Sequence, residues 1–178
     1  MAPIDFYHSP FSPPSRACLL TARQLGLDIN IKELNLLKGE QLNPEFTQLN
    51  PEHTVPTIVD GDHVLWESRA ICTYLAMQYG KGDWLYPEEP KARARVDRAL
   101  MFDMGTLSAR FENYVMPVVF QGKKPDPEAL KRLQEAVKWL DNFLEGCRYC
   151  AALHITVADH RLAATVETIR QCKISTAR

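Results

Sequence analysis

Residues 50–71 read NPEHTVPTIVDGDHVLWESRAI, and this stretch decides the fold of the first half of the chain. Two runs rich in β-branched and aromatic residues, 57–59 and 64–66, flank Asp60-Gly61-Asp62. A short polar turn containing glycine between two such runs predicts a β-hairpin. A helix is expected to follow, with Ile71, Tyr74 and Leu75 on its buried side and its end near Gly80.

The residues before the hairpin alternate short apolar runs with helical patterns, which is typical of an α/β unit. The predicted order over residues 1–80 is strand, helix, strand, helix, strand, strand, helix. Proline suits the first turn of a helix and glycine suits its end, so Pro13-Pro14 and Gly26 mark the first helix. The other predicted elements are strands at 4–7 and 29–34 and a short helix at 44–49.

A polar, proline-marked segment at residues 81–90 predicts a domain boundary, and residues 91–178 have a helical period throughout. We expect a long helix that Pro117 kinks or ends. Thr156 to Asp159 is a possible capping arrangement for the last helix. The predicted apolar stripes of the helices are Val96, Leu100, Met104, Leu107 and Phe111; Leu130, Leu133, Val137, Leu140 and Leu144; and Ala158, Leu162, Val166 and Ile169.

Charge and composition exclude several functions. The 21 Lys and Arg residues balance 22 Asp and Glu residues, so nothing predicts binding to nucleic acid or to an anionic membrane. No apolar run approaches the ~18 residues of a membrane helix, and the N-terminus does not resemble a signal peptide. Five scattered cysteines suit a reducing compartment, so we expect a cytoplasmic protein.

The first segment that could carry chemistry is the loop and helix start around Ser12. A hydroxyl just before a helix can donate to an anion, while the helix end adds positive potential. The simpler interpretation is that Ser12 only caps its own helix.

The second segment contains the Val55-Pro56 bond, which immediately precedes a strand. A cis bond there would turn the backbone of Val55 outward, where an extended peptide could pair with it. The alternative is an ordinary proline at the start of a strand.

The third segment is Glu67-Ser68-Arg69, at the start of the helix after the hairpin. Free N–H groups and the Ser68 hydroxyl suit a carboxylate, and Glu67 suits an ammonium group, so together they match the end of an amino acid. Capping by Ser68 is the alternative.

In this order and at these separations, the three segments resemble the cytosolic glutathione transferases, most closely the insect delta and epsilon classes. The similarity runs from about residue 4 to about residue 169. It rests on Phe6-Tyr7, Ser12, Pro14, Arg16, Leu36 to Glu40, residues 50–57, residues 65–71 and residues 102–107.

The resemblance implies a thioredoxin-like domain (βαβαββα) followed by an all-helical domain, working as a homodimer. It implies that Ser12 activates the thiol of glutathione, in preference to Tyr7, Ser9 or Ser15. It implies that the glutathione-binding residues are Gln41, His53, Thr54, Val55, Pro56, Glu67, Ser68 and Arg69, without a metal. The implied pocket for the second substrate contains Pro14, Leu36, Ser108, Phe111, Met116 and Phe120.

The sequence departs from the family pattern in three places. Gln41 replaces a common histidine, and Ser108 and Met116 replace tyrosines, which predicts a weaker glycyl contact and a wider pocket. The family pattern ends after Ile169, so the last helices of the family are expected to be missing and apolar surface to be exposed or covered by a partner. His160 and Arg161 are expected to be solvated.

The pair Cys147 and Cys150 raises the question of a redox or zinc site. No second Cys/His pair accompanies it, and a redox pair would be expected in the turn that here reads Ser12-Pro13-Pro14-Ser15. We therefore expect two semi-buried thiols without a further role.

The resulting hypothesis is a detoxifying glutathione S-transferase that conjugates reduced glutathione to hydrophobic electrophiles. The alternative is a non-catalytic protein that keeps the fold and binds glutathione or another ligand. A glutaredoxin-like oxidoreductase is a more distant possibility because the redox cysteine pair is absent.

Overall fold

The computed structural model describes residues 3–174, so positions 175–178 of the predicted helical domain lie outside the described residues. The chain divides into two compact units, Met1–Tyr86 and Pro87–Arg178. Each unit has its own core. Within the described residues, no helix is both long enough and apolar enough to cross a membrane.

The first unit is a four-stranded sheet with the strand order β2-β1-β3-β4. Its strands are β1 (Ile4–His8), β2 (Ile29–Glu33), β3 (Thr57–Asp60) and β4 (His63–Trp66). β1 and β2 run parallel, whereas β3 pairs antiparallel with both β1 and β4. The hairpin predicted from Asp60-Gly61-Asp62 is confirmed, and Gly61 has the positive φ of 62° that this turn requires.

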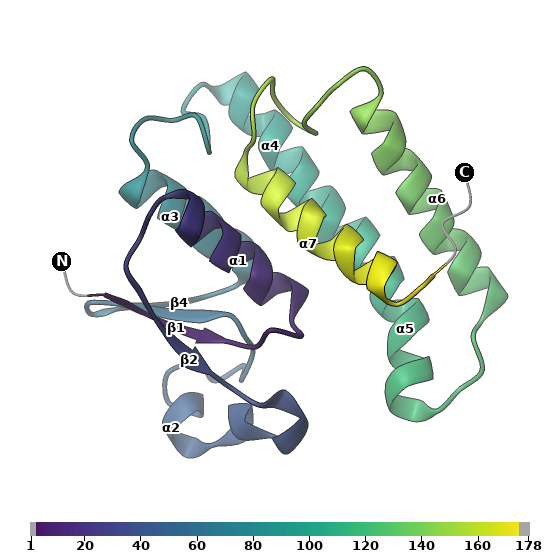
Figure 1. Ribbon diagram of the computed structural model, residues 1–178, viewed down its shortest axis with the longest axis horizontal. Helices are drawn as coiled ribbons and strands as arrows, with labels where there is room; N and C mark the ends of the chain where they lie inside the picture. Colours follow the sequence, from purple (N-terminus) through teal and green to yellow (C-terminus); the bar gives the residue numbers. More distant parts are fainter. Residues whose placement is uncertain (1–2, 175–178) are drawn as a thin grey trace. The chain divides into compact units, whose positions relative to one another are not determined.

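Helices α1 (Pro13–Gln24) and α3 (Ser68–Tyr79) pack against each other on one side of the sheet, and the short α2 (Pro44–Thr47) lies on the other (Figure 1). The first residue of α1 is a proline, as predicted. Tyr74 is only half-buried, because its hydroxyl reaches out to donate to the Asp60 carboxylate at 2.6 Å. Residues without any solvent exposure form the core of this unit: Phe6, Ala17, Cys18, Ala22, Ile58, Ile71 and Cys72.

The second unit is helical. It contains α4 (Pro90–Phe102), a π-helical segment η3 (Asp103–Ser108), α5 (Ala109–Gln121), α6 (Pro127–Leu144) and α7 (Val157–Gln171). α7 packs against α4 and α5 packs against α6. The thioredoxin-like unit followed by a helical unit agrees with the predicted fold class.

Pro117 was predicted to kink or end the long helix, and it does not end the helix. α5 continues through Pro117 to Gln121, and its C-cap Gly122 has a φ of 61°. A proline removes the hydrogen bond to the residue four positions earlier, but Asn113 is exposed, so water can satisfy its carbonyl.

The apolar stripes also differ from the prediction. Met104 is 45% exposed, and Asp103 is fully buried in its place, because the wider π-helical turn shifts the buried face of η3. Leu144 and Val166 are exposed as well. In α6 the small residues Ala129 and Ala136 are buried on the same face as Leu133 and Leu140.

The expectation that His160 and Arg161 are solvated is wrong. Arg161 is only 1% exposed, and its Nη2 donates to the Asp103 carboxylate at 2.8 Å. Thr165 donates to the other oxygen of Asp103 at 2.7 Å. The carboxylate supplied by η3 is what allows α7 to bury a charged residue.

Candidate functional site

Ser12 is the N-cap of α1 and also contacts the second predicted segment. Its Oγ accepts a hydrogen bond from the Ser15 backbone N–H at 3.3 Å, so the capping interpretation is correct. The same Oγ donates to the Val55 carbonyl oxygen at 3.4 Å, across 43 residues of sequence. The fold therefore brings the predicted thiol activator to the predicted peptide-pairing residue.

The loop that carries Ser12 is held against the first turn of α1. The Ser12 N–H donates to the Ser9 carbonyl at 3.0 Å, and the Ser9 N–H donates to Ser15 Oγ at 3.5 Å. Arg16 adds a guanidinium hydrogen bond to the Pro10 carbonyl at 2.7 Å. These bonds fix the backbone of the loop before any ligand binds.

Ser12 differs from the neighbouring serines in its exposure to solvent. Ser9 and Ser15 are 2% and 0% exposed, whereas Ser12 is only half-buried. The Tyr7 ring packs on Phe46 of α2, and its pKa is raised, first by burial and then by Asp5 and Glu45. Of the three serines in this loop and helix start, Ser12 is the one that is not buried.

The Val55-Pro56 bond is cis, as the position of this proline before a strand had suggested. Asn50, which is fully buried, holds the loop before this bond: its Nδ2 donates to the Thr54 carbonyl at 3.1 Å and to Thr57 Oγ1 at 3.0 Å. His53 is exposed and has a φ of 46°. The role of Asn50 was not predicted from the sequence, although an asparagine beside a proline is a common turn signal.

The structure does not support the alternative that Ser68 caps α3. The N-cap is Glu67, not Ser68, and its side chain makes no capping hydrogen bond. Glu67 is exposed and has a φ of 70° and a ψ of 102°, a backbone conformation that favours glycine. Ser68 is buried, and Arg69 is half-buried. The first N–H groups of the helix therefore stand beside an exposed carboxylate, which suits the ammonium and carboxylate groups of an amino acid.

Gln41 lies in a short 3-10 turn, Glu40–Leu42. Its Oε1 is buried and has no hydrogen-bond partner among the described residues. Thr54, which the resemblance also assigned to the site, is exposed and lies between His53 and Val55.

The residues predicted to line the second-substrate pocket come from both units. Pro14 and Leu36 of the first unit are half-buried. In the second unit, Phe111 is 8% exposed, Met116 is 46% exposed and Phe120 is 64% exposed. The Ser108 hydroxyl donates to Asp103 at 3.2 Å. That these residues form one pocket stays a prediction.

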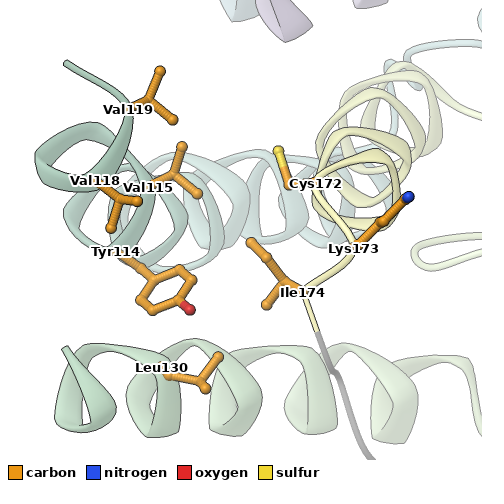
Figure 2. A pocket seen from close by; sticks show the side chains of 8 residues that line it. All are labelled: Tyr114, Val115, Val118, Val119, Leu130, Cys172, Lys173 and Ile174. Carbon is orange, nitrogen blue, oxygen red and sulfur yellow. The ribbon is translucent and has the colours of Figure 1, made fainter. Parts of the chain in front are cut away.

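A separate cavity of about 490 Å³ lies within the second unit. Figure 2 shows Tyr114 of α5 and Leu130 of α6 facing each other across it, with Ile174 between α5 and α6. The cavity shares no residue with the predicted second-substrate pocket. Its full lining is Tyr114, Val115, Val118, Val119, Leu130, Cys172, Lys173 and Ile174.

The expectation of two semi-buried thiols at Cys147 and Cys150 is wrong in detail, because Cys147 is exposed and Cys150 is buried. Burial and the neighbouring Asp159 raise the pKa of Cys150 far above its ordinary value, which disfavours the reactive thiolate. Among the described residues, no three His, Cys, Asp or Glu side chains are grouped so that they could hold a metal ion.

Comparison with known proteins identifies the family. A family model described as the N-terminal domain of glutathione S-transferase matches residues 6–89. A delta-class glutathione transferase from Nilaparvata lugens is 46% identical, with a TM-score of 0.94 over 97% of this chain and 81% of its own. The chain belongs to the glutathione transferases.

Other solved glutathione transferases agree. One from Bombyx mori is 44% identical, with a TM-score of 0.91 over 96% of this chain and 79% of its own. A glutathione transferase homologue from Drosophila mojavensis, solved with bound glutathione, is 33% identical, with a TM-score of 0.91 over 99% of this chain and 84% of its own. The delta class of the relative from Nilaparvata lugens agrees with the class that the sequence motifs indicated.

Proposed function

We propose that this glutathione transferase conjugates reduced glutathione to hydrophobic electrophiles and that Ser12 stabilises the attacking thiolate. The observation that carries the proposal is the 3.4 Å contact between Ser12 Oγ and the Val55 carbonyl. An extended peptide paired with Val55 would have its middle residue beside Ser12. In glutathione the middle residue is the cysteine.

The two ends of glutathione can be assigned to the residues on either side of this contact. The start of α3 would hold the γ-glutamyl end, with Glu67 facing the ammonium group and the helix N–H groups facing the carboxylate. His53 and Gln41 would serve the glycyl end, and Arg69 would add positive charge. The solved relative from Drosophila mojavensis, which contains bound glutathione, supports this class of ligand.

In the proposed reaction, the Ser12 hydroxyl turns from the Val55 carbonyl to the sulfur. The Ser15 N–H still donates to Ser12 Oγ, which polarises the hydroxyl toward the sulfur. The positive end of the α1 dipole acts in the same direction. A lower thiol pKa raises the thiolate fraction, and the thiolate attacks an electrophilic carbon so that the S–C bond forms as the leaving group departs.

The test is conjugation of a chlorodinitrobenzene-type substrate by the wild type and by two substitutions of Ser12. Ser12→Ala should lower kcat/KM by roughly 10²-fold or more. Ser12→Asp keeps a capping acceptor but places a negative charge toward the sulfur, so it should lose activity without losing the cap. Titration of the bound thiol by its ultraviolet absorbance should show a raised pKa in both variants.

A matched control separates catalysis from capping. Asp126 caps α6 in the second unit through the Glu128 N–H at 2.9 Å, so Asp126→Ala removes a comparable N-cap outside the proposed site. It should lower stability but leave conjugation unchanged. Full activity in Ser12→Ala would contradict the role of Ser12, and glutathione binding without any turnover in the wild type would favour a binding protein instead.

We further propose that the enzyme is a cytoplasmic homodimer acting in detoxification. Membership of the glutathione transferase family supports the dimer and this role, and the cysteine usage supports the compartment. Light scattering of the purified protein tests the dimer, since a mass near the 20.3 kDa of one chain would contradict it.

A further inference from the structure

Two buried cysteines of the first unit lie in contact without forming a disulfide. Cys18 of α1 and Cys72 of α3 are both 0% exposed, and their Sγ atoms are 3.6 Å apart. This distance is that of a hydrogen bond between the two thiols, in which either sulfur could be the donor, whereas a disulfide needs about 2.05 Å. The two helices pack directly on each other, so a shift of about 1.5 Å would join the two sulfur atoms.

The thiol pair is connected to the start of α3. The Cys18 thiol donates to the Ser68 carbonyl at 3.2 Å. On the other side of the pair, the Thr21 hydroxyl donates to Cys72 Sγ at 3.4 Å. Ser68 is the first residue of α3 and follows Glu67, so the thiol pair lies directly beneath the proposed anchor of the γ-glutamyl end.

We propose that Cys18 and Cys72 form a redox modification site, at which peroxide converts the two thiols into a disulfide that weakens glutathione binding. Each thiol gives up one proton and one electron, the S–S bond forms, and hydrogen peroxide is reduced to two water molecules. The effect on binding rests on the proposed function, whereas the formation of the disulfide does not.

The effect on glutathione follows from the hydrogen bond to Ser68. A disulfide has no S–H group, so the buried carbonyl of Ser68 loses this donor. The start of α3 must also move as the two helices are drawn together. Loss of a buried hydrogen bond and a displaced anchor should raise the Kd for glutathione about tenfold.

Burial sets the rate of this reaction. The oxidant reaches the pair only when α1 and α3 separate briefly, which is a local opening of the fold. Cys147 and Cys172 are exposed, so they should react with peroxide first. The Cys18–Cys72 bond should form in a slower phase that reflects the rate of opening.

The experiment uses the full chain with Cys147→Ser and Cys172→Ser, which removes the exposed thiols and leaves the pair intact. The folded protein is treated with hydrogen peroxide, the remaining thiols are blocked, and the digest is examined by mass spectrometry. We expect a peptide pair linked through Cys18 and Cys72 and lighter by two hydrogen atoms. Titration calorimetry should show the tenfold loss of glutathione affinity, and dithiothreitol should reverse it.

Adding Cys18→Ala to this protein provides the matched control, because it should abolish both the linked peptide and the effect of peroxide on glutathione binding. Free Cys18 and Cys72 after oxidation, or separate sulfinic acids, would overturn the proposal. A linked pair with unchanged glutathione affinity would overturn the coupling to Ser68. If the reduced protein binds no glutathione, the proposed function fails, while the linked peptide still decides whether the pair is oxidised.

Discussion

The starts of α3 and α7 differ in side-chain capping: α7 has a capping box, and α3 has no side-chain cap. At α7, the Asp159 carboxylate accepts from the Thr156 N–H at 2.8 Å and from its hydroxyl at 2.9 Å, and Thr156 is fully buried. At α3, Glu67 is exposed and caps nothing with its side chain. The start of α7 is therefore capped by its own side chains, whereas the start of α3 is left without a side-chain cap.

The same contrast extends to the charged residues of the two units. Asp103 and Arg161 are buried in the second unit and bond to each other. Glu67 in the first unit is exposed, in a backbone conformation that costs energy. The charges of Asp103 and Arg161 compensate each other inside the helical unit, whereas the exposed carboxylate and the N–H groups without a side-chain cap at the start of α3 are suited to a ligand.

The largest effect is expected from the buried ion pair. Asp103→Asn keeps the size of the side chain but leaves the Arg161 guanidinium without its counter-charge, so the free energy of unfolding should fall by about 3–5 kcal/mol. Urea unfolding followed by circular dichroism measures this loss.

Glu167→Gln is the matched control, since it makes the same chemical change in an exposed ion pair with Arg170 on α7. It should leave the urea midpoint unchanged. Equal losses in the two variants would show that the closed polar cluster of the second unit contributes no more than a surface pair.

A smaller effect is expected at the start of α3, where one substitution should raise stability and lower the affinity for glutathione. Glu67→Gly relieves a positive φ, so the free energy of unfolding should rise by about 1 kcal/mol. The variant also removes the carboxylate that we propose faces the ammonium group of glutathione, so glutathione affinity should fall. A less stable protein with full affinity would show that Glu67 serves the fold and not the ligand.

The smallest effect concerns pH. Burial lowers the pKa of His160 below its ordinary value of 6.5, although Asp159 opposes this shift. The unfolded chain then binds the proton more tightly than the folded chain, so stability is lost as pH falls through and below this value. Burial also lowers the pKa of His8, so His8 should affect stability in the same direction as pH falls.

His160→Gln should therefore flatten, without abolishing, the fall of the urea midpoint between pH 7 and pH 5. A slope that is the same in wild type and His160→Gln would contradict the role assigned to burial.

The sequence predicted most elements of the first unit because their signals are local. A turn glycine, a proline at a helix start and alternating apolar residues each act within a few residues. The second unit was predicted less well, because the period of apolar residues assumes a regular α-helix. The π-helical turn at Asp103–Ser108 breaks that assumption.

By itself, the sequence determined the order of the elements, the hairpin at Gly61, the family and the candidate residues of the site. Only the tertiary structure decided that Ser12 meets Val55, that Cys18 meets Cys72 and that Arg161 is buried against Asp103. The physical reason is separation along the chain. Local patterns reveal which face of an element is apolar, but a polar group is stable inside a protein only if its partner, here 58 residues away for Arg161, is brought to it by the fold.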